Sequence, residues 1–186
     1  MYSKLSDESL IEKIASSDET AFKEVYNRYN KVIFNYLNRL VFDKTALEDL
    51  FQNTFLKVFS KADKFNSKYK FKSWIYKIAT NEYLDYYKKL KRDKSKLSLN
   101  DDLLYDKVND YDIEQVIYDQ QKLSCFFDAL KEISSPFKEA FVMRRMQGLS
   151  LAETSIALNV SDRTVKNYCD KAEAFIKSYL SGKSFN

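Results

Sequence analysis

The sequence predicts an all-α protein with two small helical domains joined by an acidic linker, the C-terminal domain carrying a helix-turn-helix. Turn-forming residues are scarce, since the 186-residue chain has one proline and two glycines, too few for the turns of a multi-stranded sheet. Apolar residues recur at helical spacing along most of the chain. From residue 93 to about residue 111 that period fades and Asp, Asn, Ser and Lys dominate, which indicates a domain boundary.

Three helices are expected in the first 65 residues. Ser6 can cap a short helix, and a second helix begins at about Asp18 and carries a long apolar stripe. Its aromatic residues share one face with aliphatic residues, so we expect them in the core. Thr45 and Glu48 form a capping box that opens a third helix, which runs to about Phe65.

The third helix combines a polar row with neighbouring apolar residues. Asp49, Gln52 and Asn53 project away from its inward face, and Phe55 and Leu56 lie beside them. An apolar side chain next to fixed amide and carboxylate groups suits a protein-docking surface. A polar helix face is more often simply solvated, and this alternative stays open.

Residues 64–73, KFNSKYKFKS, form a basic loop with interleaved aromatic residues. Lysines can follow a phosphate backbone while aromatic rings stack on unpaired bases, so this composition suits single-stranded nucleic acid. The alternative is a lysine-rich surface loop that Phe65 and Phe71 anchor to the core, and the residues favour neither. A further helix follows, and residues 57–92 together hold eleven Lys and Arg against three Asp and Glu.

Residues 148–177 predict the helix-turn-helix. Ser150 and Glu153 form a capping box that starts a helix at Leu151. Asn159 tolerates the left-handed backbone that can end this helix, and Ser161 can cap the next one. The turn then spans about three residues, as this motif requires.

The second helix of this motif has one apolar and one polar face. Its inward residues are Val165, Cys169, Ala172 and Ile176, and its outward residues are Arg163, Lys166, Asn167 and Lys171. The outward face can meet phosphates and base edges in a major groove. A capped helix pair with a solvated face in an ordinary bundle is the alternative.

Earlier in the second domain, a helix is expected to resume near Asp112. Ser135 and Pro136 can cap and start another helix, which Gly148 ends.

Composition excludes several kinds of chemistry. The chain has no histidine, so a histidine base or histidine-bound metal is excluded. Cys125 and Cys169 lack the C-x-x-C spacing and resemble buried apolar residues in a reducing compartment. We find no phosphate-binding glycine loop and no metal-ligand cluster, so no cofactor or metal is expected. No apolar run reaches membrane length and no signal peptide is visible, so we expect a soluble, cytoplasmic protein.

Read in order, these segments resemble the extracytoplasmic-function (ECF) group of bacterial sigma factors, the dissociable subunits that bring RNA polymerase to promoters. Three motifs carry the resemblance. The family pattern D-L-x-Q-x-x-F-x-K is met by Asp49-Leu50, Gln52, Phe55 and Lys57. The pattern F-x-x-W-[LI]-x-x-I-A-x-N-x-x-x-D is met by Phe71, Trp74-Ile75, Ile78-Ala79, Asn81 and Asp85. The recognition-helix pattern is met by Ser161, Thr164-Val165-Lys166 and Lys171-Ala172.

The resemblance implies a region 2-like domain at residues 1–92, an acidic linker at 93–118 and a region 4-like domain at 119–186. It implies two partners, core RNA polymerase and promoter DNA, and suggests an anti-sigma factor as a third. The implied polymerase-docking residues are Asp49, Gln52, Asn53 and Phe55. The implied −10 element residues are Phe65, Asn66, Ser67, Lys68, Tyr69, Lys70, Asn81, Asp85 and Lys88. The implied −35 element residues are Arg163, Thr164, Lys166, Asn167 and Lys171.

Two other classes of protein are alternatives to a sigma factor. A stand-alone helix-turn-helix regulator with an N-terminal partner- or ligand-binding domain explains residues 148–177 equally well, but it leaves the polar row of the third helix and the basic loop without a task. A DNA-processing enzyme is disfavoured because no nucleophile with a paired base is visible. The expectation is therefore a protein without enzymatic activity.

Overall fold

The computed structural model describes residues 2–93 and 124–182, and within them every regular element is helical. The main helices are α1 (Asp7–Ala15), α2 (Glu19–Asn38), α3 (Lys44–Ser60), α4 (Phe71–Asp93), α6 (Ser135–Phe141), α7 (Leu151–Leu158) and α8 (Asp162–Ser181). Residues 124–132 are also helical. The predicted all-α class is thus confirmed. The acidic linker and the helix expected near Asp112 lie outside the described residues.

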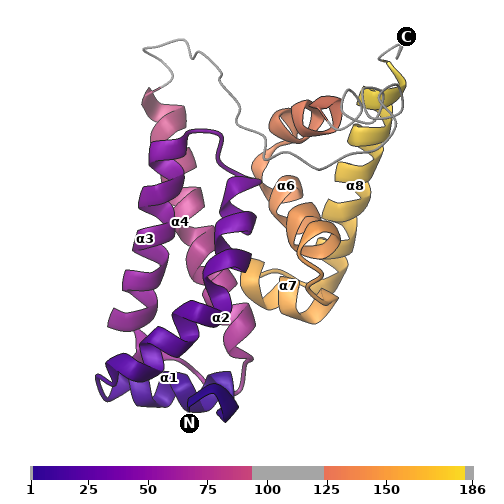
Figure 1. Cartoon of the computed structure of the whole chain (residues 1–186). Helices are drawn as coiled ribbons and strands as arrows, with labels where there is room; N and C mark the ends of the chain where they lie inside the picture. Colours follow the sequence, from indigo (N-terminus) through magenta and orange to yellow (C-terminus); the bar gives the residue numbers. More distant parts are fainter. Residues whose placement is uncertain (1, 94–123, 183–186) are drawn as a thin grey trace, which may run out of the picture.

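Helices α1 to α4 form the first domain (Figure 1). The expected starts of its first two helices are confirmed, because the Ser6 hydroxyl accepts from the Ser9 amide at 3.1 Å and the Asp18 carboxylate accepts from Ala21 at 3.0 Å. Buried aliphatic and aromatic residues of all four helices meet in one core. The long apolar stripe of α2 contributes Val25, Ile33 and other buried side chains to it, as predicted.

The start of the third helix differs from the prediction. Asp43 caps α3, and its carboxylate accepts from the amide of Ala46 at 2.7 Å. The helix therefore begins at Lys44, and the predicted box of Thr45 and Glu48 lies within the helix instead of at its start. An Asp side chain caps at least as well as Thr, and the extended backbone of Asp43 places its carboxylate at the free amides.

The second domain contains the helical residues 124–132 and the helices α6 to α8 (Figure 1). Ser134 rather than Ser135 occupies the cap position of α6, one residue earlier than predicted. The Ser135 hydroxyl instead donates to the carboxylate of Glu139. After α6 the chain forms one π-helical segment, Val142–Met146, and then turns at Gly148, whose φ of +65° favours glycine.

The two domains pack against each other side by side (Figure 1), and α7 contacts α4. One hydrophobic core runs through both domains. The Tyr76 hydroxyl of α4 donates to the side chain of Gln147 at 3.4 Å, and Lys72 lies 3.8 Å from the carboxylate of Glu153. Among residues 2–93 and 124–182, no helix combines the length and apolar character that crossing a membrane requires.

Candidate functional site

The polar row of α3 is exposed. Asp49, Gln52 and Asn53 all lie on the surface of this helix. Leu56 follows Asn53, Gln52 and Asp49 by three, four and seven residues, so it lies on the same face, and 65% of it is exposed. An exposed leucine flanked by a carboxylate and two amides has the composition of a protein-docking surface. We call these four residues the α3 face.

Phe55, which the resemblance groups with the docking residues, lies beneath this face and not on it. Only 4% of Phe55 is exposed, and its ring lies edge-on to Tyr26 at 4.9 Å and to Phe51 at 5.2 Å. The 100° turn between adjacent helical residues separates Phe55 from Leu56, so one packs against α2 and the other faces outward. Phe55 therefore supports the α3 face from below.

The basic loop combines anchors with exposed residues. Phe71 is fully buried, and Phe65 packs edge-on to Trp74 at 5.4 Å, so both anchor the loop to the core. Helix α4 begins at Phe71 instead of following a loop that ends at residue 73, and the Phe71 amide donates to Glu8 of α1 at 3.2 Å. The residues between these anchors are exposed: Asn66, Ser67, Lys68, Tyr69 and Lys70.

Local hydrogen bonds fix the shape of this loop. The Asn66 side chain accepts from the amide of Lys68 at 3.0 Å, and the Asn66 carbonyl accepts from the amide of Tyr69 at 3.0 Å. The Tyr69 side chain is 49% exposed between two exposed lysines. A rigid loop that holds one aromatic ring between cations can stack a base and neutralise its phosphates.

One face of α4 continues from this loop. Asn81, Asp85 and Lys88 are spaced by four and three residues and are all exposed. Lys88 and Asp85 form a surface ion pair at 3.7 Å, which contributes little to stability in water. Trp74 and Lys77 precede them on the same side of the helix, so this face runs from the loop along most of α4.

The helix-turn-helix has the predicted geometry. Ser150 and Glu153 close a reciprocal capping box at 3.1 and 2.8 Å. Asn159 ends α7 in the left-handed region with φ of 56°, and the Ser161 hydroxyl caps α8 by accepting from the amide of Thr164 at 3.1 Å. The four residues predicted to face inward on α8 are all buried: Val165, Cys169, Ala172 and Ile176.

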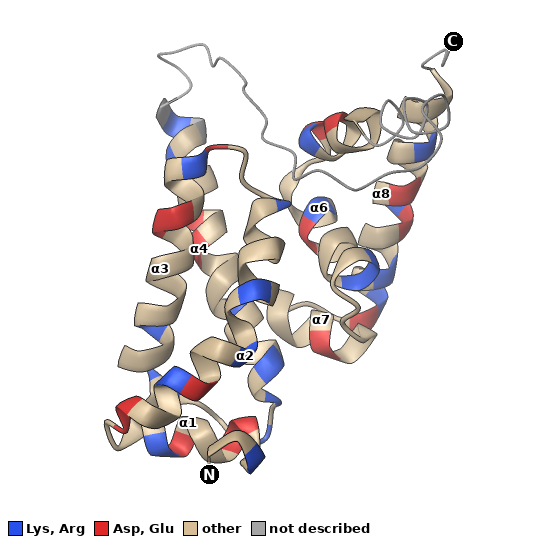
Figure 2. Cartoon of the chain, viewed as in Figure 1, with Lys and Arg blue, Asp and Glu red and all other residues tan. Residues whose placement is uncertain are grey.

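The opposite face of α8 is polar and open. Arg163, Lys166, Asn167 and Lys171 are exposed, whereas Thr164 is half-buried and bonds to the capping hydroxyl of Ser161. Lys and Arg alternate with Asp and Glu along this helix (Figure 2). The arrangement lets three cations and one amide approach a nucleic-acid duplex from a single side.

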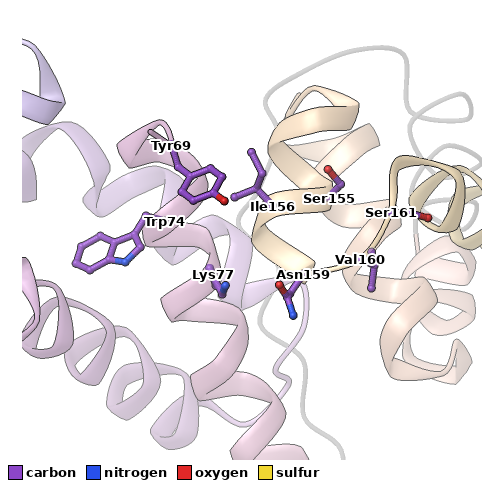
Figure 3. Close-up of a pocket in the computed structure, with 8 residues that line it drawn as sticks. All are labelled: Tyr69, Trp74, Lys77, Ser155, Ile156, Asn159, Val160 and Ser161. Carbon is purple, nitrogen blue, oxygen red and sulfur yellow. The ribbon is translucent and has the colours of Figure 1, made fainter. Parts of the chain in front are cut away.

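A groove between the domains was not foreseen from the sequence. Tyr69, Trp74 and Lys77 line one side, and residues of α7, the turn and the start of α8 line the other (Figure 3). The opposite wall is formed by Ser155, Ile156, Asn159, Val160 and Ser161. The groove encloses about 480 Å³. Sequence patterns describe one helix at a time, so they could not predict a groove between two domains.

Two buried charged residues of α6 were also missed. Lys138 is 4% exposed and Glu139 is 2% exposed. Burial lowers the pKa of Lys138 to about 8 and raises the pKa of Glu139 to about 7. The Ser135 hydroxyl donates to Glu139, while Lys138 donates to the carbonyl oxygen of Lys131 at 3.1 Å. The sequence shows Lys138 and Glu139 as adjacent opposite charges, but it does not show that both are buried.

Comparison with known families agrees with the motifs. Residues 25–93 match sigma-70 region 2, and residues 124–176 match sigma-70 region 4. The first range contains α3 and the basic loop, and the second contains the helix-turn-helix. The chain belongs to the sigma-70 family of RNA polymerase sigma factors, in its extracytoplasmic-function group. Proteins of this family are transcription initiation factors and not enzymes.

Relatives that align with most of this chain are named as ECF RNA polymerase sigma factors. It is 23% identical to the ECF RNA polymerase sigma-E factor of Haemophilus influenzae over 97% of this chain and 98% of that protein. It is 23% identical to the ECF RNA polymerase sigma factor SigM of Bacillus subtilis over 83% of this chain and 92% of that protein.

Solved structures share the fold of this sigma factor. CnrH in complex with the cytosolic domain of CnrY matches with a TM-score of 0.71 and 19% identity over 96% of this chain and 99% of that chain. The sigma factor RpoE of Bartonella quintana in complex with the anti-sigma factor NepR matches with a TM-score of 0.71 and 20% identity, over 88% of this chain and 98% of that chain. At this identity the likeness establishes the fold alone.

Proposed function

We propose that this sigma factor binds core RNA polymerase in the cytoplasm and directs promoter-specific DNA binding, strand opening and transcription initiation. The observation that carries the proposal is that one chain of this family presents three separate exposed faces. These are the α3 face, the basic loop with the polar side of α4, and the outward side of α8. A stand-alone regulator needs only the third.

The α3 face is the proposed polymerase contact. Leu56 supplies an apolar centre, and Asp49, Gln52 and Asn53 surround it with one charge and two amides. A partner with a matching apolar groove and a basic rim would bury Leu56 and satisfy the polar groups. Phe55 fixes the angle of α3 beneath this contact.

The basic loop and α4 form the proposed −10 contact. Tyr69 can stack on an unpaired base, and Lys68 and Lys70 can neutralise its flanking phosphates. Phe65 positions the loop through its contacts with Trp74 and Phe71. Asn66 and Ser67 shape the turn, and the exposed face of α4 extends the same surface through Asn81, Asp85 and Lys88.

Helix α8 forms the proposed −35 contact. Arg163, Lys166 and Asn167 lie in its first two turns, where a recognition helix meets base edges in the major groove. Lys171 lies one turn further and suits a phosphate, although its ammonium group also rests 5.4 Å from the ring of Phe137. Thr164 acts chiefly as part of the helix cap.

An anti-sigma factor is a further proposed partner. One structural neighbour with this fold is a sigma factor in complex with a protein named as an anti-sigma factor, and another is CnrH in complex with the cytosolic domain of CnrY. A protein that covered the α3 face or separated this chain from the polymerase would hold it inactive. Co-purification of the tagged chain from its own cells under non-inducing conditions, followed by mass spectrometry, tests for such a partner.

Run-off transcription tests the main proposal. Core polymerase is incubated with genomic DNA with and without the purified chain, and new transcript starts are mapped by sequencing. The proposal expects a set of starts that depend on the chain and share upstream elements. If no start depended on the chain and the chain alone bound a duplex tightly, the stand-alone regulator would be favoured instead.

A further inference from the structure

The packed arrangement places the basic loop of the first domain beside the turn that precedes α8. Tyr69 of the basic loop and Ser161 at the start of α8 both line the groove of Figure 3. The face of α4 that carries Asn81 also borders a second cavity, of about 170 Å³, whose opposite wall includes Asn159 and Val160. Helix α7 and the turn after it therefore lie beside Tyr69 and Asn81, two residues of the proposed −10 contact.

A promoter cannot be bound in this arrangement, and this step rests on the proposed function. The −10 and −35 elements are named for positions about 25 base pairs apart, which span roughly 85 Å of duplex at 3.4 Å per base pair. Arg163 follows Ser161 by two residues, so the start of the proposed −35 contact lies close to the groove that Tyr69 lines. Two contacts placed this close together cannot reach both ends of such a span. The domains must separate before both elements are bound, so the contact that holds them together opposes activity.

Two cation–π contacts join the domains. The ammonium group of Lys138 lies 5.4 Å from the ring of Phe42, in the segment between α2 and α3. The guanidinium group of Arg39, just after α2, lies 4.8 Å from the ring of Phe127 in the second domain. Such contacts hold two surfaces together without requiring a buried ion pair.

Glu139 lies at the centre of the contact. It is 2% exposed and lines the 170 Å³ cavity together with Thr80 and Leu84 of α4. Burial raises the pKa values of Tyr36 in α2 and Tyr83 in α4, and the nearby charge of Glu139 raises them further. Among the described residues, no Lys or Arg forms an ion pair with it, and the Ser135 hydroxyl is its hydrogen-bond donor.

A buried carboxylate without an ion-pair partner is unfavourable, whereas a neutral carboxyl group at the same position is tolerated. Separation of the domains would expose Glu139 to water and remove this penalty. We propose that the free chain closes its two domains on the protonated carboxyl group of Glu139, so that release of this proton promotes their separation.

The direction of the pH effect follows from the two states. Burial raises the pKa of Glu139 to about 7 in the closed chain, and its ordinary pKa is 4.5. The closed state therefore binds more protons between these values. Closure is fully favoured below about pH 4.5 and weakens as the pH rises through 7, by up to about tenfold per pH unit in the ratio of closed to open chains.

Other titratable groups at the contact do not reverse this direction below pH 7. Lys138 stays charged there, because its pKa is lowered only to about 8. The pKa values of Tyr36 and Tyr83 are raised above their ordinary value, so both stay neutral. Lys77 and Tyr168 also line the cavity. The negative charge of exposed Glu132 favours the charged form of Lys138.

The test measures the size of the free chain at pH 5.5 and pH 7.5 by small-angle X-ray scattering. The fluorescence of Trp74, the single tryptophan, reports independently because its side chain lines the groove. We expect wild type to expand at pH 7.5 with a shift in Trp74 emission, and the ratio of closed to open chains to fall more than tenfold. Glu139→Gln stays neutral and should remain compact at both values.

The matched control is Glu12→Gln, which removes an exposed carboxylate from α1 and should expand as wild type does. Equal size of wild type at both pH values, or expansion of Glu139→Gln alongside wild type, would overturn the proposal. These readouts need neither polymerase nor promoter, so their failure is distinct from a failure of run-off transcription.

A second variant keeps the proposal testable if Glu139→Gln does not fold. Ile156→Glu places a charge on α7 in the groove and should hold the domains apart. Carbon-13 NMR of labelled glutamate should then show the Glu139 carboxyl group titrating near 7 in wild type and near 4.5 in Ile156→Glu. Titration near 7 in an expanded Ile156→Glu chain would contradict the proposed link between burial and closure.

Discussion

The hydroxyl oxygens of Tyr36 and Thr80 lie 2.9 Å apart, at buried positions of α2 and α4. Thr80 donates its own proton to the carbonyl oxygen of Tyr76 at 2.7 Å, so the Tyr36 hydroxyl is the donor to Thr80. This short chain of hydrogen bonds satisfies two hydroxyl groups that are otherwise cut off from water. It lies beneath the surface on which the second domain packs.

Thr80→Val tests this chain, because valine keeps the shape of threonine but cannot accept a hydrogen bond. The Tyr36 hydroxyl would be left buried without a partner, which is expected to lower the free energy of unfolding by about 1–3 kcal/mol. Urea unfolding followed by circular dichroism measures the change. Thr45→Val, at an exposed position of α3, is the matched control and should change stability by less than about 0.5 kcal/mol. Equal midpoints for the two variants would argue against the hydrogen-bond chain.

Leu56 is exposed and Phe55 is buried, and this difference gives a second prediction. Leu56→Asp should weaken binding to core polymerase at least tenfold while leaving stability nearly unchanged, because the side chain is mostly exposed. Phe55→Ala should instead lower the free energy of unfolding by about 3–5 kcal/mol, through loss of its ring contacts. Pull-down with core polymerase and urea unfolding separate the two effects.

Asp49→Ala combined with Gln52→Ala should reduce polymerase binding in the same pull-down and leave binding to a −35 duplex intact. If the double variant and Leu56→Asp both retained wild-type affinity for core polymerase, the α3 face would not be the docking surface.

Local signals were read well from the sequence, and the reason is physical. Four side chains cap helices by bonding to amides two or three residues away: Ser6, Asp18, Ser150 and Ser161. The neighbouring sequence is therefore enough to predict their role. Asp43 was overlooked because a second capping pattern follows it directly, and both fit the same turn. The burial of Phe55 could not be predicted, because a helix with apolar residues on several sides does not reveal which side is covered.

Contacts between the domains lay beyond this kind of reasoning. Tyr69 and Ser161 meet in one groove although almost half the chain separates them, and no local pattern links the two. Glu139 likewise shares a cavity with Thr80 and Leu84 from the other domain. Periodicity identifies which face of a helix is apolar, but it does not identify the partner that covers it.

Lys166→Ala tests the outward face of α8. Loss of this exposed cation should weaken binding of the holoenzyme to a cognate −35 element by about 5- to 100-fold and leave affinity for core polymerase unchanged. Filter binding at several salt concentrations should also show a smaller salt dependence if Lys166 contacts a phosphate. Lys177→Ala removes an exposed lysine near the other end of the same helix and should have little effect. Equal loss of both affinities would contradict the assignment.

Asn159 and Ser17 are the two non-glycine residues with positive φ in the described part of the chain, at 56° and 65°. The left-handed backbone disfavours a side chain by roughly 1–2 kcal/mol, and asparagine tolerates it better than alanine or serine. We therefore expect Asn159→Ala to lower the free energy of unfolding by about 1 kcal/mol and Asn159→Gly to leave it nearly unchanged. Ser17→Gly, at the turn between α1 and α2, should raise it by up to about 1 kcal/mol. Urea unfolding of the three variants measures these changes, and a stability loss in Asn159→Gly equal to that in Asn159→Ala would show that the asparagine side chain, and not the backbone angle, matters at the turn.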